Sequence, residues 1–422
     1  MEGAAGAAES SVSRGPWLTA VCASELGTLF VFSNFSALLP LLKQEWQLSD
    51  TQAGAITGFY QVGYIAAVAI LATLTDYMPP RRIYLLSALW AGLTSLAFAF
   101  WAEGFVSALV LRGLVGLGLA GTYMPGMRLV AERFASGRRG FAMGCYIGTF
   151  TIGTSISLLI TAWAHSYWGW RWAFAVTGMG PFAAGIIAWF VLPLGMAAVP
   201  RQAGAEVAAP AGFAPVLRNR SAVRLIAAYG GHTWELMGMR GWIVPFFTAS
   251  LVARGADLVD ATRVAALAGS AVLAVGALPH PFSGLLSDRL GRAKPISAFM
   301  LLSAACSFTM GWALHWSWAS LVALGLLYGI LVTAESAIIS TGVADSAEPL
   351  YLGRTMALQS TWGFACGAIG PAAFGLALDW APWFGASPDG AWIWGFGLLG
   401  AGALVGPIAV GFREFSRTPR RI

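Results

Sequence analysis

Charged residues are scarce in this chain. Only 10% of its 422 residues are aspartate, glutamate, lysine or arginine, whereas 57% are hydrophobic. A soluble domain is about a quarter charged, so this composition leaves too few charges to cover a surface in water. A soluble protein is therefore excluded, and we expect a multi-pass integral protein whose outer surface contacts the lipid bilayer.

The alternating pattern of a transmembrane β-barrel is also missing. Barrel strands alternate apolar and polar residues over about 10 positions, whereas residues 65–74 form an apolar run without alternation. A helical span needs about 20 mainly apolar residues, so the chain has room for roughly twelve spans. The sequence therefore predicts an all-α membrane protein with twelve transmembrane helices.

Signals of catalysis or metal binding are few. The four cysteines lie far apart in predicted spans, without the spacing of metal ligands. There is no G-x-S-x-G nucleophile elbow or phosphate-binding loop, and no loop is long enough to fold as a catalytic domain. We expect no metal, no cofactor and no enzymatic activity. A membrane-embedded sensor or enzyme is a remote alternative.

Lysine is nearly absent, and arginine supplies most of the 25 basic residues. If the N-terminus is cytoplasmic and the spans alternate, most of these residues fall on cytoplasmic segments, and the exceptions on the other side are Lys43, Arg171, Arg254 and Arg263. This is the positive-inside distribution. It predicts cytoplasmic termini in a bacterial inner (plasma) membrane, and it argues against nucleic acid as a partner despite the net charge of +6.

The longest polar stretch, 195–221, divides the chain into two similar parts. We expect a cytoplasmic tail over 1–16, a six-helix half over 17–194, a cytoplasmic linker over 195–221, a second six-helix half over 222–412 and a cytoplasmic tail over 413–422. Two pseudo-symmetric halves around a central cavity are typical of secondary transporters. We expect such a protein to function as a monomer.

A loop motif after the second span of each half points to a family. Residues 284–294 read G-L-L-S-D-R-L-G-R-A-K, whereas the corresponding stretch at 72–82 keeps the aspartate and the following basic pair. The complete copy resembles the cytoplasmic loop motif of the major facilitator superfamily. The resemblance implies alternating access, with a charge cluster that forms in one state and breaks in another. The gate residues it implies are Asp76, Arg81, Glu132, Arg139, Asp288, Arg289, Arg292, Asp345 and Arg354.

The fourth span is similar to a second motif of the same superfamily, an arginine followed by spaced glycines. Residues 112–121 read R-G-L-V-G-L-G-L-A-G. A cation inside the membrane is costly unless it is paired or hydrated. Glu25 in the first span is the candidate partner of Arg112, and a water-filled cavity or an anionic substrate are the alternatives.

The seventh span carries three ionisable side chains within nine residues: His232, Glu235 and Arg240. His232 and Glu235 share a helix face, whereas Arg240 lies about 140° round from Glu235. Histidine titrates near neutral pH, and arginine suits bidentate recognition of a carboxylate. The alternative is a structural pair between Glu235 and Arg240.

The candidate residues for substrate binding and proton coupling come from several spans. Glu335 lies toward the cytoplasmic end of the predicted span 317–341 and could belong to the gate instead. Two tryptophans are candidates because they lie in mid-span beside polar residues. The full set is Glu25, Asn34, Arg112, His232, Trp234, Glu235, Arg240, Glu335 and Trp362.

These residues favour a transporter that moves a small organic anion by symport with protons. The two intramembrane arginines would compensate the anion, and the carboxyl and imidazole groups would carry protons. The main alternative is a drug/proton antiporter that exports cationic or amphipathic compounds, because three intramembrane carboxylates could bind a cation. Proton-coupled drug exporters of this superfamily carry a glycine–proline motif in span five, but span five here has Gly144, Gly148 and Gly153 without a proline.

Overall fold

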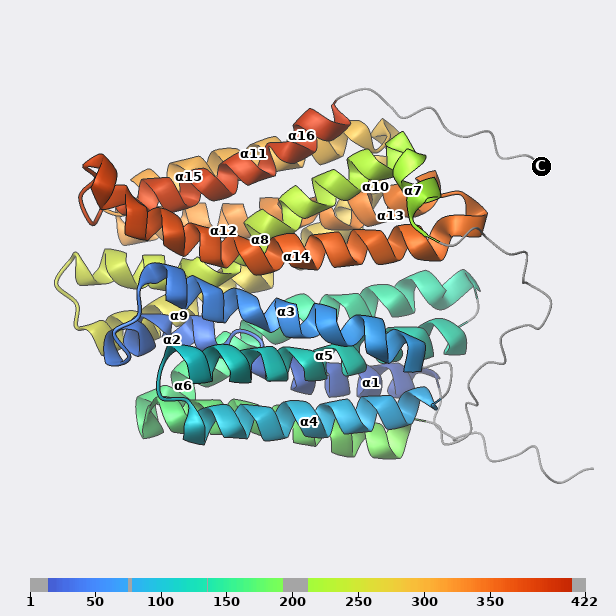
Figure 1. Cartoon of the computed structure of the whole chain (residues 1–422), viewed down its shortest axis with the longest axis horizontal. Helices are drawn as coiled ribbons and strands as arrows, with labels where there is room; N and C mark the ends of the chain where they lie inside the picture. Colours follow the sequence, from blue (N-terminus) through green and yellow to red (C-terminus); the bar gives the residue numbers. More distant parts are fainter. Residues whose placement is uncertain (1–13, 75–77, 135, 193–211, 412–422) are drawn as a thin grey trace, which may run out of the picture. The chain divides into compact units, whose positions relative to one another are not determined.

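The computed structural model describes residues 14–74, 78–134, 136–192 and 212–411, apart from a few side chains within helices. The described chain is almost entirely helical (Figure 1). It forms two compact units. The first comprises the described parts of Met1–Asn34, Gly63–Ala102 and Leu111–Ala205, and the second those of Phe35–Val62, Glu103–Val110 and Glu206–Ile422. The halves 17–194 and 222–412 remain a prediction.

The first unit is built from helices of the N-terminal part of the chain. Two of these helices, α3 (Asp50–Leu74) and α5 (Phe105–Arg133), begin in the second unit and end in the first. The remaining elements of the first unit are α1 (Arg14–Thr28), the 3₁₀ turn η1 (Leu29–Val31), α4 (Pro80–Trp101) and α6 (Ser136–Val191).

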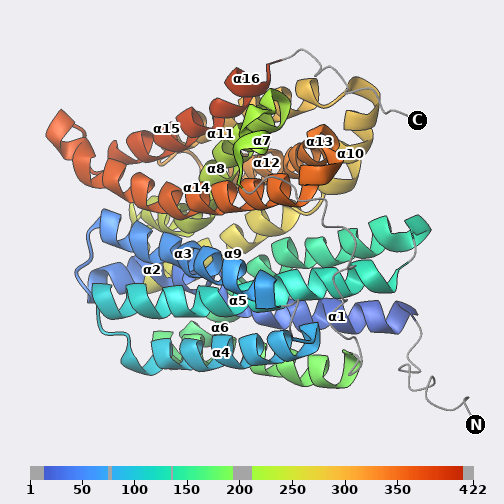
Figure 2. The ribbon, with the colours of Figure 1, turned by 45° about the vertical axis from the view of Figure 1, so that its right-hand side comes forward.

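The second unit contains α2 (Asn34–Glu45), apart from its first residue, the first parts of α3 and α5, and all elements from α7 onward. Within it, α11, α15 and α16 run beside one another in both views of the ribbon (Figures 1 and 2). The elements are α7 (Ala214–Arg218), α8 (Arg220–Val252), α9 (Leu258–Val275), α10 (Pro279–Leu290), α11 (Ala293–Trp312), α12 (Trp318–Ala334), α13 (Ser336–Ser346), η2 (Pro349–Tyr351), α14 (Leu352–Trp380), η3 (Ala381–Phe384), α15 (Ala391–Ala403) and α16 (Val405–Val410).

Nine helical segments in the described part of the chain are long and apolar enough to cross a membrane. The longest, Phe141–Val191, has 51 residues. A continuous helix of that length would measure about 75 Å, whereas the hydrocarbon core is about 30 Å thick. The segment is broken at Gly169, whose φ of 80° lies outside the helical region. The sequence predicts two separate spans in this region, over 141–163 and 172–194, and the break lies between them. The count of twelve spans stays a prediction.

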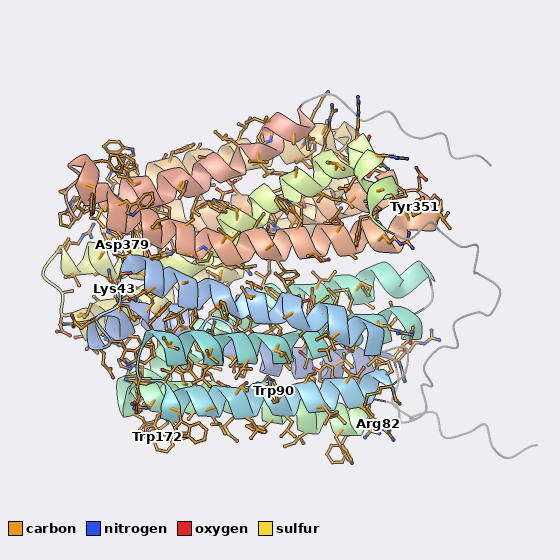
Figure 3. The ribbon with its side chains drawn as sticks, in the orientation of Figure 1. Lys43, Arg82, Trp90, Trp172, Tyr351 and Asp379 are labelled. Atoms are coloured by element: carbon orange, nitrogen blue, oxygen red, sulfur yellow. The ribbon has the colours of Figure 1, made fainter. Side chains whose placement is uncertain are left out.

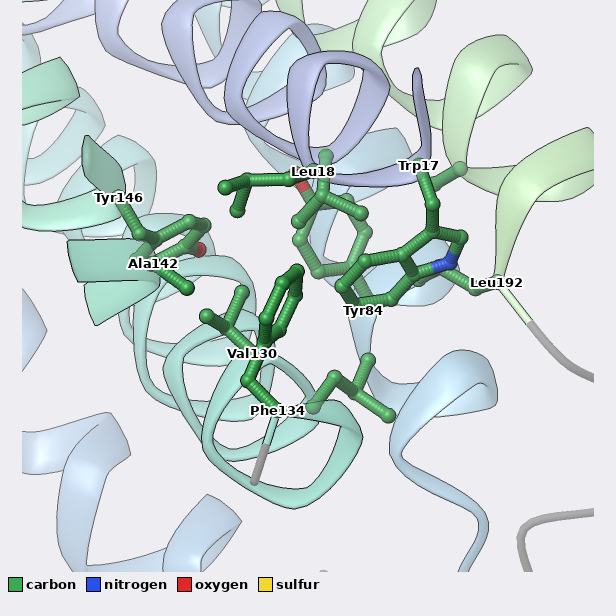
Figure 4. Close-up of a cluster of buried hydrophobic side chains, with 11 residues drawn as sticks. Trp17, Leu18, Tyr84, Val130, Phe134, Ala142, Tyr146 and Leu192 are labelled. Carbon is green, nitrogen blue, oxygen red and sulfur yellow. The ribbon is translucent and has the colours of Figure 1, made fainter. Parts of the chain in front are cut away.

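Buried and exposed side chains fit a helical bundle in lipid. In the first unit, aromatic and aliphatic side chains of α1, α4, α5 and α6 form a buried cluster that includes Trp17, Tyr84, Phe134 and Tyr146 (Figure 4). Large apolar side chains also lie on the surface, for example Phe190, which is 78% exposed. An exposed apolar surface is costly in water and favourable in the hydrocarbon core.

Helix α3 packs closely on a neighbour in each unit because it has glycines at the contacts. A Cβ atom on Gly63 would lie only 1.8 Å from the carbonyl oxygen of Gly113 in α5. In the second unit, Cβ atoms on Gly54 and Gly58 would lie 2.1 and 1.9 Å from carbonyl oxygens of α14. Small residues permit such close approach between membrane helices.

Candidate functional site

A buried imidazole–carboxyl pair lies in the second unit. The Nδ1 atom of His232, on α8, is 2.9 Å from Oε1 of Glu335. The two side chains are 1% and 0% exposed. The other oxygen of Glu335, Oε2, has no hydrogen-bond partner among the described residues. This pair can hold a proton on either partner, away from water.

Glu335 occupies a break between two helices. It ends α12 and begins α13, and the apolar segment Trp318–Ser346 continues past it. Glu335 was expected toward the cytoplasmic end of the predicted span 317–341. Because the helical segment runs on to Ser346, Glu335 lies well inside it and pairs with the seventh span instead of a gate residue.

Glu235 lies one helical turn from His232 on α8. Its Oε2 atom accepts a hydrogen bond of 2.8 Å from Ser303 Oγ on α11, and Oε1 accepts one of 3.1 Å from the Tyr328 hydroxyl on α12. The structure therefore gives this buried carboxyl two hydroxyl donors rather than the structural pair with Arg240 that the sequence left as an alternative. Sequence reasoning missed Ser303 and Tyr328, although mid-span hydroxyl groups are the donors that a buried carboxyl requires.

The other candidates of the second unit lie on α8 and α14. Arg240 is buried on α8, with 6% of its surface exposed. The Trp234 indole donates to the carbonyl oxygen of Leu398, 3.3 Å away, and Trp362 is 49% exposed. The indole of Trp362 also packs against Gly230, since a Cβ there would lie 2.2 Å from its Nε1. The two tryptophans thus pack on helices rather than forming an aromatic cage.

In the first unit, the expected partnership of Arg112 with Glu25 is wrong. Arg112 donates from Nη1 to Asn34 Oδ1 at 3.0 Å and to the carbonyl oxygen of Val31 at 2.9 Å, and from Nη2 to that of Phe32 at 2.8 Å. The interruption at η1 leaves these carbonyl groups outside a regular α-helix, so they are free to accept. Asn34, another candidate, therefore belongs to a structural network around Arg112.

Glu25 instead resembles Glu235 in its surroundings. Its Oε2 atom accepts hydrogen bonds from the hydroxyls of Tyr146, at 2.9 Å, and Tyr84, at 3.4 Å. Its Oε1 atom has no hydrogen-bond partner among the described residues. Glu25 and Glu235 each lie on the first helix of a predicted half, and each accepts from a buried tyrosine. Sequence reasoning proposed both carboxyls but none of the tyrosines.

Two of the predicted gate residues contact each other in the second unit. Arg292 donates to Oδ2 of Asp345 from Nε at 3.0 Å and from Nη2 at 2.5 Å. Arg354 stacks over the Tyr351 ring at 5.8 Å, and Arg289 is exposed. Asp288 lies in α10, but its side chain is outside the described part of the structure.

The predicted gate residues of the first unit have local partners. Arg81 donates to the carbonyl oxygen of Trp189 at 2.5 Å, and its guanidinium lies 4.9 Å from the centre of the Trp189 ring. Glu132 pairs with Arg128 at 2.8 Å. Asp76 and the side chain of Arg139 lie outside the described residues.

A polar contact that sequence reasoning missed lies at one end of the second unit, where Lys43 and Asp379 are labelled in Figure 3. Both carboxylate oxygens of Asp379, on α14, accept from the start of α3. The backbone N–H groups of Asp50 and Thr51 donate at 3.0 and 2.8 Å, and the Thr51 hydroxyl donates at 2.6 Å. Lys43 pairs with Asp50 beside this contact. A carboxylate that accepts from free N–H groups caps a helix.

No group of three or more histidine, cysteine, aspartate or glutamate side chains in the described ranges is arranged to hold a metal ion. The candidate residues of the second unit provide buried carboxyl, imidazole, guanidinium and hydroxyl groups. These groups can bind anions and exchange protons.

Comparisons with solved structures place this fold among transporters. A bacterial homolog of the human lysosomal transporter Spinster, in an inward-facing and occupied conformation, matches with a TM-score of 0.71 at 16% identity, covering 94% of this chain and 95% of that one. The nucleoside transporter NupG (D323A mutant) matches with a TM-score of 0.72 at 14% identity, covering 94% and 100%.

Sequence relatives include three bacterial proteins. The fosmidomycin resistance protein of Escherichia coli is 24% identical, covering 86% of each chain. A probable 4-methylmuconolactone transporter of Cupriavidus pinatubonensis is 30% identical over 34% of this chain and 35% of its own length. The gallate transporter of Pseudomonas putida is 27% identical over 37% and 34%. The match thus spans about a third of the last two proteins.

A family model described as Major Facilitator Superfamily matches residues 21–371, most of the chain. The helical fold and the transporters that share it agree with that match. The chain therefore belongs to the Major Facilitator Superfamily of membrane transporters.

Proposed function

We propose that this protein is a proton-coupled secondary transporter of a small organic anion, without enzymatic activity. The observation that carries the proposal is the buried pair of His232 and Glu335, with Glu235 one turn away on α8. Ionisable groups inside a membrane protein are costly and mark ion or substrate pathways. Three such groups on neighbouring helices are more than packing requires.

The first step is proton loading. With the proton on His232, the pair is an imidazolium beside a carboxylate. A second proton would neutralise Glu335 and leave the pair with a net positive charge. Because a charge isolated in a low-dielectric interior is unfavourable, the doubly protonated cluster favours arrival of an anion. The anion and the proton then cross together with little net charge.

The second step is recognition of the anion. Arg240 is buried on the same helix as His232 and Glu235, and a guanidinium forms bidentate hydrogen bonds with a carboxylate. Two relatives are named as transporters of 4-methylmuconolactone and gallate. Together these observations support a small carboxylate as substrate. Arg112 is assigned to structure instead, because its guanidinium already binds Asn34 and two carbonyl groups.

The third step is alternating access. The contact of Arg292 with Asp345 is half-exposed, so it can break without leaving a charge buried and unpaired. We assign it to a cytoplasmic gate, with both termini in the cytoplasm and the protein acting as a monomer in a bacterial inner membrane. Two six-helix halves, 17–194 and 222–412, would move about the substrate between them.

Export of a drug is the second candidate function. The fosmidomycin resistance protein matches 86% of this chain, more than the organic-anion transporters do. Glu25 and Glu235, each with tyrosine hydroxyls as donors, would then serve a proton-driven antiporter.

Uptake into proteoliposomes tests the proposal. We expect labelled gallate or a related aromatic carboxylate to accumulate when the outside is acidic, and the accumulation to collapse when a protonophore dissipates the gradient. A substrate panel should include lipophilic cations. Accumulation of a cation when the gradient is reversed, with the inside acidic, and no response to carboxylates would favour the antiporter and contradict the symporter.

A further inference from the structure

An apolar groove of about 480 Å³ runs between α4 and α6 in the first unit. Its walls are formed mainly by large apolar side chains, and Ile186 and Trp189 are each more than half exposed. In a membrane protein such a surface is covered by lipid chains or by another helix. Six of its lining residues are Leu85, Leu89, Phe182, Gly185, Ile186 and Trp189.

Two arginines lie at the start of α4, about one helical turn before the groove-lining Leu85, and Figure 3 labels one of them, Arg82. Arg82 is exposed and lies three residues before Leu85 and seven before Leu89, so the three side chains share a helix face. The neighbouring Arg81 is buried, donates to the carbonyl oxygen of Trp189 and stacks over its ring. Arg81 thus fixes the wall of the groove, and Arg82 is the cation at its mouth.

We propose that this groove binds an anionic phospholipid, with an acyl chain along Leu85, Leu89 and Ile186 and the phosphate at Arg82. The positive charge of Arg82 beside an apolar groove favours an occupant with an apolar chain and an anionic headgroup. An apolar chain suits the groove, and a guanidinium hydrogen-bonds a phosphate in a bidentate manner. Basic residues at the cytoplasmic membrane surface attract anionic lipid headgroups. A zwitterionic lipid would bind less tightly, because its own ammonium group would lie near the Arg82 guanidinium. A helix packed in the groove would make no use of the charge of Arg82.

Two substitutions test the binding of the headgroup and of the acyl chain separately. Arg82→Gln removes the cation from an exposed position. Gly185→Leu fills the groove, and the change is sterically allowed because a Cβ on Gly185 would lie 3.7 Å from its nearest neighbour, the Cβ of Ala88. Leu89→Trp fills the groove from the other helix, in case Gly185→Leu does not fold. Arg218→Gln, which removes an exposed arginine on α7, is the matched control for lost charge.

The test is native mass spectrometry of the full chain, purified in mild detergent with equimolar phosphatidylglycerol and phosphatidylcholine of identical acyl chains. We expect wild type and Arg218→Gln to retain phosphatidylglycerol about fivefold over phosphatidylcholine, the contribution of one arginine near a membrane surface. Arg82→Gln should retain both equally. Gly185→Leu or Leu89→Trp should retain less of both.

Three results would overturn the proposal. Equal retention of the two lipids by the wild type would remove the preference itself. An unchanged preference in Arg82→Gln would place the headgroup elsewhere, and unchanged retention in folded groove variants would show that the chain binds elsewhere. A dimer that excludes lipid from the wild type would assign the groove to a second copy of the protein.

Discussion

The Nδ1 atom of His232 lies 2.9 Å from Oε1 of Glu335, and both side chains are excluded from solvent. Neither residue has a second hydrogen-bonding side chain among the contacts that the structure gives it. The pair therefore depends on its two members, and each should be costly to remove alone.

A double-mutant cycle measures that dependence. His232→Gln or Glu335→Gln alone replaces one half of a buried pair, so each should lower the free energy of unfolding by about 1–3 kcal/mol. The double variant should lose less than the sum of the two, with a coupling of about 0.5–3 kcal/mol. The measurement is chemical unfolding in detergent. His165→Gln, another histidine within a helix, is the control, and additive losses would show that the pair is not coupled.

Arg112 has a structural role, and its substitution should report on folding rather than on affinity. Arg112→Gln removes the guanidinium that donates hydrogen bonds to Asn34 Oδ1 and to two backbone carbonyl oxygens at the helix break. Each buried acceptor left without a donor costs about 1–3 kcal/mol. We expect a strongly lowered melting temperature, measured by thermal unfolding, that saturating substrate does not restore. A stable Arg112→Gln protein with weakened substrate binding would return Arg112 to the substrate site.

Asp379 caps α3 and should contribute to stability. Asp379→Ala leaves the N–H groups of Asp50 and Thr51 without their acceptor, and loss of such a cap costs about 0.5–2 kcal/mol. Asp389→Ala is a matched control, because Asp389 forms an exposed pair with His315, and exposed pairs contribute at most about 1 kcal/mol. Thermal unfolding of both variants tests the difference. Equal effects of the two substitutions would argue against the cap.

The contact of Arg292 with Asp345 should matter for transport more than for stability. Both side chains are partly exposed, so we expect Asp345→Arg to change unfolding by less than about 1 kcal/mol. Its uptake rate should nevertheless fall severalfold, because two arginines repel across the gate. The reversed pair, Arg292→Asp with Asp345→Arg, should recover most of the rate. Asp260→Arg, which reverses another exposed pair, serves as control. If the reversed pair did not recover the uptake rate, this contact would not be part of the gate.

The sequence predicted what depends on local pattern. Apolar runs predicted the helices, and the predicted gate residues included both Arg292, from the loop motif at 284–294, and Asp345. Two separate spans, over 141–163 and 172–194 on either side of Gly169, were also predicted. These features require only the identity and spacing of neighbouring residues.

The partners of buried groups could not be predicted. His232 and Glu335 are candidates on different helices, and only the packing of α8 against the junction of α12 and α13 brings them together. Glu25 was the candidate partner of Arg112 because it carries the opposite charge in a neighbouring predicted span. Its actual partners are mainly backbone carbonyls, which every residue has and no sequence pattern marks. Asp379 was missed because its partners are likewise mainly backbone groups, 328 or more residues away.

Comparing two modes of transport in the same proteoliposomes tests the central claim most directly. Glu335→Gln and His232→Gln should still exchange labelled for unlabelled gallate, because exchange requires substrate binding and not net proton movement. Both should fail to accumulate gallate in response to an acidic outside, whereas His165→Gln should do so like the wild type. Accumulation at the wild-type rate and extent in both variants would contradict the assignment of the coupled proton to this pair.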